Sequence, residues 1–173
     1  MHKSTSPGGV VPWPAPGVSY CCKSNPSDHG SDSQFPQIAD PTNQRVRKVS
    51  NGVITTIAGN GSKDFGGDGG SALNSGLFTP TEIAFGPDRK LYVLDVDHAR
   101  IRRIDLVSGT ISTVAGNGEP TASGDGGPPL GAGLGAPRGL AIDSAGNLYV
   151  TDVKSGRLRI VRPARNRISL PPD

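Results

Sequence analysis

A 30-residue segment occurs twice in this chain, and its internal spacing is preserved. Residues 51–80 and 108–137 each contain a β-rich run, a long glycine-rich loop and a closing proline. In both copies the aspartate of a Gly-Asp-Gly-Gly motif precedes that proline by 12 residues. Random glycine-rich sequence does not keep its spacing, so one structural unit is used more than once. The chain therefore folds as repeated units placed side by side.

A second motif sets the length of the repeat. At three places an aspartate is followed by arginines five and seven residues later, and the aspartates are 55 and then 57 residues apart. Repeats of this length are typical of solenoids, propellers and arrays. A catalytic dyad would be expected once, so recurrence favours a structural ion pair between each aspartate and the arginine five residues on. The predicted pairs are Asp40 with Arg45, Asp95 with Arg100, and Asp152 with Arg157.

Four short β-strands are expected in each complete unit. β-branched and aromatic residues form the runs, and Gly, Pro and Asp separate them. In the complete unit the expected strands are residues 81–85, 91–94, 100–104 and 110–115. The last copy repeats three of them, at residues 138–142, 148–150 and 157–161, and residues 167–169 align with the start of the fourth. Four antiparallel strands in each unit describe a blade of a β-propeller.

These motifs resemble the NHL-repeat family of β-propellers, in the long subtype found in bacteria. The resemblance covers about residues 35–170 and rests on four segments, which are residues 95–104, 109–118, 124–128 and 137–150. It implies an all-β fold. Because NHL propellers usually close with about six blades, the chain is expected to form an incomplete β-propeller of about two and a half four-stranded antiparallel blades.

The chain divides into a leader and three repeat copies. Residues 1–34 are rich in Pro, Gly and Ser, and we expect a disordered leader that also holds the adjacent Cys21 and Cys22. Neighbouring cysteines rarely bridge each other, so no disulfide framework is expected. Residues 35–79 form an incomplete first blade, without a recognisable innermost strand, and its following loop. Residues 80–136 form a complete blade and its following loop, and residues 137–173 form an incomplete last blade.

So few blades leave both ends of the array uncovered. Three arrangements remain open: a fragment of a longer propeller, an open array, or a ring that two chains close together. Self-association through the exposed blade ends belongs to the third arrangement. No window approaches the roughly 18 apolar residues that a membrane helix needs, so no membrane span is expected. No export signal is visible either, and the cellular compartment is left undetermined.

The expected binding face lies at one end of the blades. Strand direction alternates, so the loops after the second and fourth strands of a blade emerge at the same end, and long loops there are more often functional than short ones. We expect a non-enzymatic interaction scaffold that binds a protein partner through this face. The residues assigned to partner binding are Asp97, His98, Lys154, Arg157, Arg159 and Arg162.

The alternative function is binding of RNA or another phosphate backbone. Between Asp152 and Asp173 the chain has no acidic residue but carries a run of basic ones. No aromatic residues are interleaved with them to stack on bases, as single-strand readers usually require. Solvated arginines on an outer strand are therefore the preferred interpretation of this run.

Catalytic and metal chemistry have little support in the sequence. Asp68 and Asp125 lie within the Gly-Asp-Gly-Gly motifs, where calcium ligands are conceivable, but the spacing of oxygen-bearing residues matches no known calcium loop. We expect both aspartates to form turns with backbone N–H groups. His98 is the one histidine within the repeats, and no cofactor is predicted. A remnant of a propeller lyase or lactonase is the third hypothesis.

Overall fold

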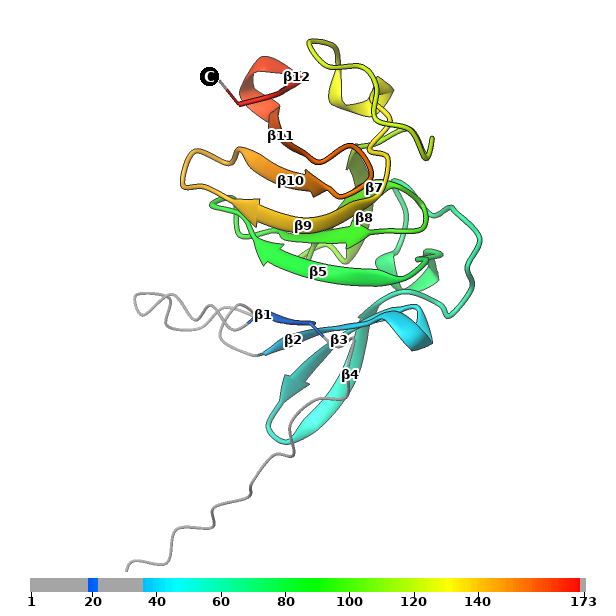
Figure 1. The fold of residues 1–173 in the computed structure, drawn as a ribbon. Helices are drawn as coiled ribbons and strands as arrows, with labels where there is room; N and C mark the ends of the chain where they lie inside the picture. The colour runs from blue at the N-terminus through cyan, green and yellow to red at the C-terminus, as the bar shows by residue number, and fades with distance from the viewer. Residues whose placement is uncertain (1–18, 22–35, 172–173) are drawn as a thin grey trace, which may run out of the picture.

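The computed structural model describes residues 19–21 and 36–171, and within them it is an incomplete β-propeller of three four-stranded antiparallel sheets (Figure 1). We call the sheets blades 1, 2 and 3. Blade 1 consists of β1 (Ser19–Cys21), β2 (Gln37–Asp40), β3 (Arg45–Ser50) and β4 (Val53–Ala58). Blade 2 consists of β5 (Pro80–Phe85), β6 (Leu91–Asp95), β7 (Arg100–Asp105) and β8 (Thr110–Ala115). Blade 3 consists of β9 (Pro137–Ile142), β10 (Leu148–Asp152), β11 (Arg157–Arg162) and β12 (Arg167–Ser169).

Helical structure in the described residues is limited to short 3₁₀ turns. They are η2 (Pro41–Asn43), η3 (Ala72–Asn74), η4 (Pro129–Gly131) and η5 (Pro163–Arg165). In the part of the chain that the structure describes, no helix is long and apolar enough to cross a bilayer. Two of these turns, η3 and η4, lie inside the two long glycine loops and shape them.

The first strand of each blade lies innermost. β1 and β2 pack against β5, and β5 packs against β9, so the three sheets lie next to one another (Figure 1). The expectation that blade 1 lacks its innermost strand was wrong. β1 pairs antiparallel with β2, with Ser19 opposite Ala39 and Cys21 opposite Gln37. Backbone pairing over three residues needs no side-chain motif, so no motif in residues 19–21 indicated this strand.

Blade 3 also has its fourth strand. Ile168, in β12, pairs opposite Val161 of β11. The described residues thus hold three four-stranded sheets, where about two and a half blades were expected. The disorder expected for the leader concerns residues 1–34, and apart from Ser19–Cys21 these lie outside the described residues.

In residues 19–21 and 36–171, two hydrophobic cores hold the blades together, one between each pair of neighbours. The middle blade contributes to both, because successive side chains of a strand point to opposite faces of the sheet. In β6, Leu91 and Val93 pack toward blade 1, whereas Tyr92 and Leu94 pack toward blade 3. Every residue of β6 is buried as a result. The cores set the spacing between blades, and the long loops span the gaps at one end.

Candidate interaction face

Two long glycine loops connect the blades. Loop A (residues 59–79) joins β4 to β5, and loop B (residues 116–136) joins β8 to β9. Both loops lie at the end of the blades that is drawn on the right in Figure 1. This is the end at which the expected binding face was placed.

The tip of each loop pairs with the outermost strand of the blade that follows. In loop A, Gly69 N–H donates to the carbonyl of Ile111 on β8 at 2.8 Å, and Ile111 N–H donates to Gly70 O at 3.1 Å. In loop B, the N–H of Gly126 donates to the carbonyl of Ile168 on β12 at 2.7 Å. The return bond runs from Ile168 N–H to the next loop residue at 3.0 Å. Each Gly-Asp-Gly-Gly tip thus covers the edge of a sheet that would otherwise be open.

Arg102, on β7, fastens loop A to blade 2. Its guanidinium donates to the carboxylates of Asp68 at 2.9 Å and Asp95 at 3.3 Å, and the side chain is fully buried. It also donates to the carbonyls of Gly66 at 3.0 Å and Gly76 at 3.3 Å, on the two sides of the loop. One side chain therefore binds the tip, both sides of the loop and the blade itself.

Arg159, on β11, does the same for loop B. Its Nε donates to the carboxylate of Asp125 at 2.8 Å, and one of its terminal nitrogens donates to the carbonyl of Ser123 at 2.6 Å. Its other terminal nitrogen donates to Gly133 O, and the side chain is again fully buried. The prediction that Arg159 lies on a partner-binding surface is therefore corrected, because no part of its side chain reaches that surface.

Two of the three predicted Asp/Arg pairs were assigned to the wrong arginine. Asp95 binds Arg102, seven residues on, and Asp40 lies 3.4 Å from Arg47, also seven residues on. Arg100 instead donates to the carbonyls of His98 at 2.9 Å and Asn117 at 2.6 Å. It thereby joins the β6–β7 turn to the start of loop B.

Arg45 of the first copy has the same role as Arg100, whereas Arg157 of the last copy does not. Arg45 donates to the carbonyls of Asn43 at 2.9 Å and Asn60 at 3.0 Å, so it joins the β2–β3 turn to the start of loop A. Arg157, the predicted partner of Asp152, is half exposed and lies 3.8 Å from Asp125. Each loop is thus held at its start by an arginine of the preceding blade and at its tip by an arginine of the following one.

The aspartates of the Gly-Asp-Gly-Gly motifs are structural, but by a different mechanism from the one expected. Asp68 and Asp125 accept hydrogen bonds from arginine side chains, where backbone N–H groups were predicted. Among residues 19–21 and 36–171, no group of three or more His, Cys, Asp or Glu side chains is placed to hold a metal ion.

Two glycines of the loops have a conformation that other residues rarely adopt. Gly67 has a φ of +88°, and a Cβ on it would lie 2.8 Å from the Cα of Ser75. Gly124, at the same place in loop B, has a φ of +78°, and its Cβ would lie 2.9 Å from the Cα of Ala132. Both the left-handed backbone and the close approach of the two sides of the loop require glycine here.

His98 links the β6–β7 turn to loop A. Its Nδ1 lies 2.9 Å from the carboxylate of Asp95, and its Nε2 lies 2.8 Å from the carbonyl oxygen of Lys63. Both partners accept hydrogen bonds, so the arrangement is fully satisfied when both ring nitrogens carry a proton. Burial opposes the charged ring, but the hydrogen bond and the charge of Asp95 outweigh it and raise the pKa of His98 above its ordinary value.

Phe65 is the exposed aromatic residue of loop A. Its side chain is 45% exposed, and the guanidinium of Arg100 lies 3.9 Å from the centre of its ring. The ring of His98 packs edge-on at 5.5 Å. Cation–π and aromatic contacts of this kind fix the orientation of the ring before any partner arrives. Phe65 is not among the site residues predicted from the sequence, although a phenylalanine between the polar and glycine-rich residues of loop A was a usable signal.

The corresponding place in blade 3 is built from different residues. Lys154 Nζ donates to the carbonyl of Pro120 at 3.1 Å, as His98 does to loop A. The hydroxyl of Ser155 donates to Asp152 at 2.8 Å. Burial opposes the charged form of Asp152, but hydrogen bonds from the backbone N–H of Ala136 and from Ser155 keep its pKa below the ordinary value. In both blades, the turn between the second and third strands is thus bonded to the long loop. The side chains that make this contact, and those exposed beside it, differ between the blades.

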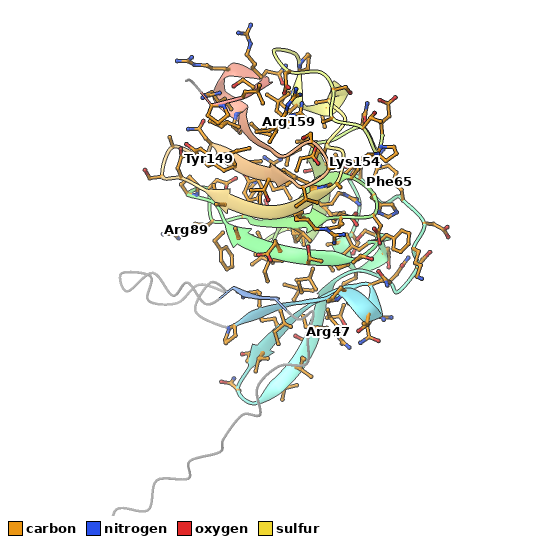
Figure 2. The ribbon with its side chains drawn as sticks, in the orientation of Figure 1. Arg47, Phe65, Arg89, Tyr149, Lys154 and Arg159 are labelled. Atoms are coloured by element: carbon orange, nitrogen blue, oxygen red, sulfur yellow. The ribbon has the colours of Figure 1, made fainter. Side chains whose placement is uncertain are left out.

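The residues assigned to partner binding do not all lie on the surface. Asp97, Lys154 and Arg157 are exposed, His98 is buried, and Arg162 is partly buried and bonded to the hydroxyl of Ser169. Figure 2 shows Phe65, on loop A, and Lys154, in the turn between β10 and β11, at the same end of the molecule. The structure thus brings Asp97, Lys154 and Phe65 to the loop face. The basic residues of blade 3 do not form one continuous exposed run, because the side chain of Arg159 is buried.

One repeat of this chain matches a known family model. The model described as NHL repeat matches residues 134–161, from the end of loop B through β9 and β10 to β11. The chain carries an NHL repeat. This NHL repeat contains both Asp152 and the buried Arg159 that fastens loop B, so the matched segment includes the fastening as well as the strands.

Proteins that are similar to this chain are much longer than the chain itself. Teneurin-1 of Gallus gallus is 33% identical over 88 residues, which cover 43% of this chain and 3% of that protein. A structural genomics protein of unknown function from Bacteroides thetaiotaomicron has a TM-score of 0.65 at 21% identity, over 73% of this chain and 32% of that one. A virginiamycin B lyase from Staphylococcus aureus has a TM-score of 0.53 at 16% identity, over 82% and 38%. The chain thus spans about a third of these solved structures, which share its fold.

Proposed function

We propose that this chain is a non-enzymatic interaction scaffold, and that the loop face binds a protein partner with Phe65 at its centre. The observation that carries the proposal is a half-exposed aromatic ring held in place by Arg100 and His98. Aromatic anchors with a fixed orientation dominate the binding energy of protein interfaces. A preformed anchor also reduces the entropy lost on binding.

The surroundings of Phe65 fit the rim of such an interface. Lys63 and Asp64 precede Phe65 in loop A, Asp97 precedes His98, and all three are exposed and carry charges of both signs. A charged rim around an apolar anchor is the usual composition of a protein interface. The expected partner therefore presents an apolar or aromatic side chain flanked by both acidic and basic residues.

The competing hypothesis is an enzyme, since a lyase shares this fold. His98 is the one histidine of the described residues, and both of its ring nitrogens are engaged, by Asp95 and by the carbonyl of Lys63. General acid–base catalysis needs a ring nitrogen within reach of the substrate. The bonding of His98 supports the scaffold function over this alternative.

The test compares three versions of the full-length chain as bait for proteins from the cells that produce it. Partners are captured by a photo-crosslinking residue placed at Asp97 and identified by mass spectrometry. We expect Phe65→Ala to reduce the affinity for the identified partner by at least about tenfold, as for an interface hot spot. Val107→Ala, at a fully exposed side chain in the β7–β8 turn, serves as the control and should bind as the parent chain does. Equal binding by all three chains would contradict the proposal.

A further inference from the structure

Blade 1 has a sheet edge that corresponds to two covered edges elsewhere in the chain. In blades 2 and 3 the loop tips bind Ile111 and Ile168, whose side chains are 1% and 0% exposed. The repeat places Ile54 of β4 at the same position, and its side chain is 55% exposed. Its neighbour Val53 is 60% exposed. Of three equivalent positions, two are covered by a Gly-Asp-Gly-Gly tip and one is open.

The arginine that belongs to this edge is also exposed. Arg47 is the equivalent of Arg102 and Arg159, but its side chain is 27% exposed where theirs are 0%. Arg47 donates to Asp40 at 3.4 Å and to the hydroxyl of Thr56 at 2.8 Å. Its bonding partners in the described residues thus belong to its own blade, whereas Arg102 and Arg159 each bind an incoming loop.

The backbone of β4 is oriented to accept a loop tip. In blade 2, Ile111 lies opposite Ile104 of β7 and directs its N–H and carbonyl outward to loop A. In blade 1, Ile54 lies opposite Val49 of β3 in the same register. Its N–H and carbonyl therefore point to the open side of β4, which is the last strand of its sheet. An edge of this kind readily pairs with another chain.

We propose that this acceptor edge (Arg47, Val53 and Ile54) binds a Gly-Asp-Gly-Gly loop of a partner chain. The loop backbone pairs with Ile54, and the aspartate carboxylate binds the guanidinium of Arg47. A second copy of this chain is a poor occupant, because its own two tips are already bound to Ile111 and Ile168. The site is separate from Phe65 and does not depend on the proposed function: Figure 2 shows Arg47 on blade 1 and the loop residue Phe65 beside blade 2.

The probe is a synthetic peptide with the sequence of loop A, residues 59–79, added to the ¹⁵N-labelled full-length chain. We expect the NMR signals of the Val53 and Ile54 amides and of Arg47 Nε to shift in a saturable way. The signals of Ile111 and Ile168 should stay in place, because those edges are occupied. A peptide with Asn in place of Asp68 should bind about tenfold more weakly, since a hydrogen bond between charged groups is lost.

Two variants of the chain separate the parts of the site. Arg47→Met should weaken binding of the parent peptide about tenfold. This variant should bind the parent peptide and the peptide with Asn in place of Asp68 with equal affinity. Ile54→Pro removes the outward N–H, a change that edge strands tolerate, and should abolish the shifts while the β3–β4 pairing persists. No saturable shift at Val53 and Ile54, or equal affinity for both peptides, would overturn the proposal. So would a concentration-dependent dimer of the chain alone, seen by sedimentation, that blocks the peptide.

Discussion

Arg159 donates a hydrogen bond from Nε to Asp125 at 2.8 Å, across 34 residues of chain. Arg102 and Asp68 are joined at 2.9 Å across the same separation. In both cases a buried arginine of the third strand of a blade binds the tip of the loop that enters that blade. The glycine loops therefore connect consecutive blades in addition to forming the loop face. We call each buried arginine, together with the aspartate that it binds at the loop tip, a clamp. Because a blade contacts only its neighbours, such clamps add to the coupling that the inter-blade cores supply.

The first prediction concerns the buried pair beneath loop A. Arg102→Met removes one of the two basic partners of Asp95, the other being His98, and the side chains of Arg102 and Asp95 are both fully buried. Loss of one partner from a buried pair destabilises a protein by roughly 3–5 kcal/mol, and we expect the lower end of this range because His98 stays beside Asp95. Urea denaturation should show this loss in the free energy of unfolding. Arg138→Met, at an exposed position of β9, is the matched control and should change it by less than about 0.5 kcal/mol. Similar losses for both variants would contradict the assignment.

The second prediction concerns the turn inside each loop. Gly67→Ala introduces a Cβ at positive φ and at 2.8 Å from the backbone of Ser75. We expect a loss of at least about 1 kcal/mol in the free energy of unfolding, from backbone strain together with overpacking. Gly131→Ala is the control, because that glycine has no positive φ and a Cβ there meets no atom within 4 Å. Thermal unfolding of the two variants should separate them, and a stable Gly67→Ala chain would show that the loop has another conformation.

The third prediction is a pH dependence through His98. Its pKa in the folded chain is raised above the ordinary 6.5, so the stabilisation is complete below about pH 6.5 and is lost as the pH rises through the folded pKa. The free energy of unfolding should therefore decrease when the pH is raised from about 6 to about 9. His98→Asn should remove that part of the fall. If the variant shows the same slope as the parent chain, another group is responsible.

The strands were largely predictable from the sequence. The expected strand at residues 110–115 agrees with β8, residues 167–169 coincide with β12, and the other expected strands of blades 2 and 3 differ by one or two residues at their ends. Alternation of side chains and the Gly, Pro and Asp turns determine these elements locally. β1 was not predictable, because Ser19–Cys21 carries no repeat motif and is fixed by pairing with β2.

The partner of each buried arginine was harder to predict from the sequence than the strands. Asp95 and Arg100 lie directly opposite each other in the β6–β7 ladder, so their spacing correctly indicated proximity. Arg102 lies on the same face one step further along, within reach of a long side chain on the diagonal. Which of the two arginines binds the carboxylate depends on the path of loop A, whose tip is 34 residues away in the chain. Spacing within a motif does not contain that information.

The fourth prediction concerns local opening at loop B. Asp125→Asn weakens the bond to Arg159, and the aspartate side chain is 28% exposed, so the loss of global stability should be modest, about 1 kcal/mol or less. The local effect should be larger: hydrogen exchange of the Gly126 and Ile168 amides, which pair across the tip, should accelerate. Glu119→Gln, at an exposed position of the same loop, is the control and should leave these amides unchanged.

The clamp is tested most directly by a double-mutant cycle on Asp125 and Arg159. The free energy of unfolding is measured for the parent chain, Asp125→Asn, Arg159→Met and the double variant. The single change at Arg159 also removes its bonds to Ser123 and Gly133, and the cycle separates that loss from the pair itself. If the loop is fastened as described, the two side chains should couple by about 0.5–1 kcal/mol. Additivity within about 0.3 kcal/mol would show that loop B is not held to blade 3 through this pair.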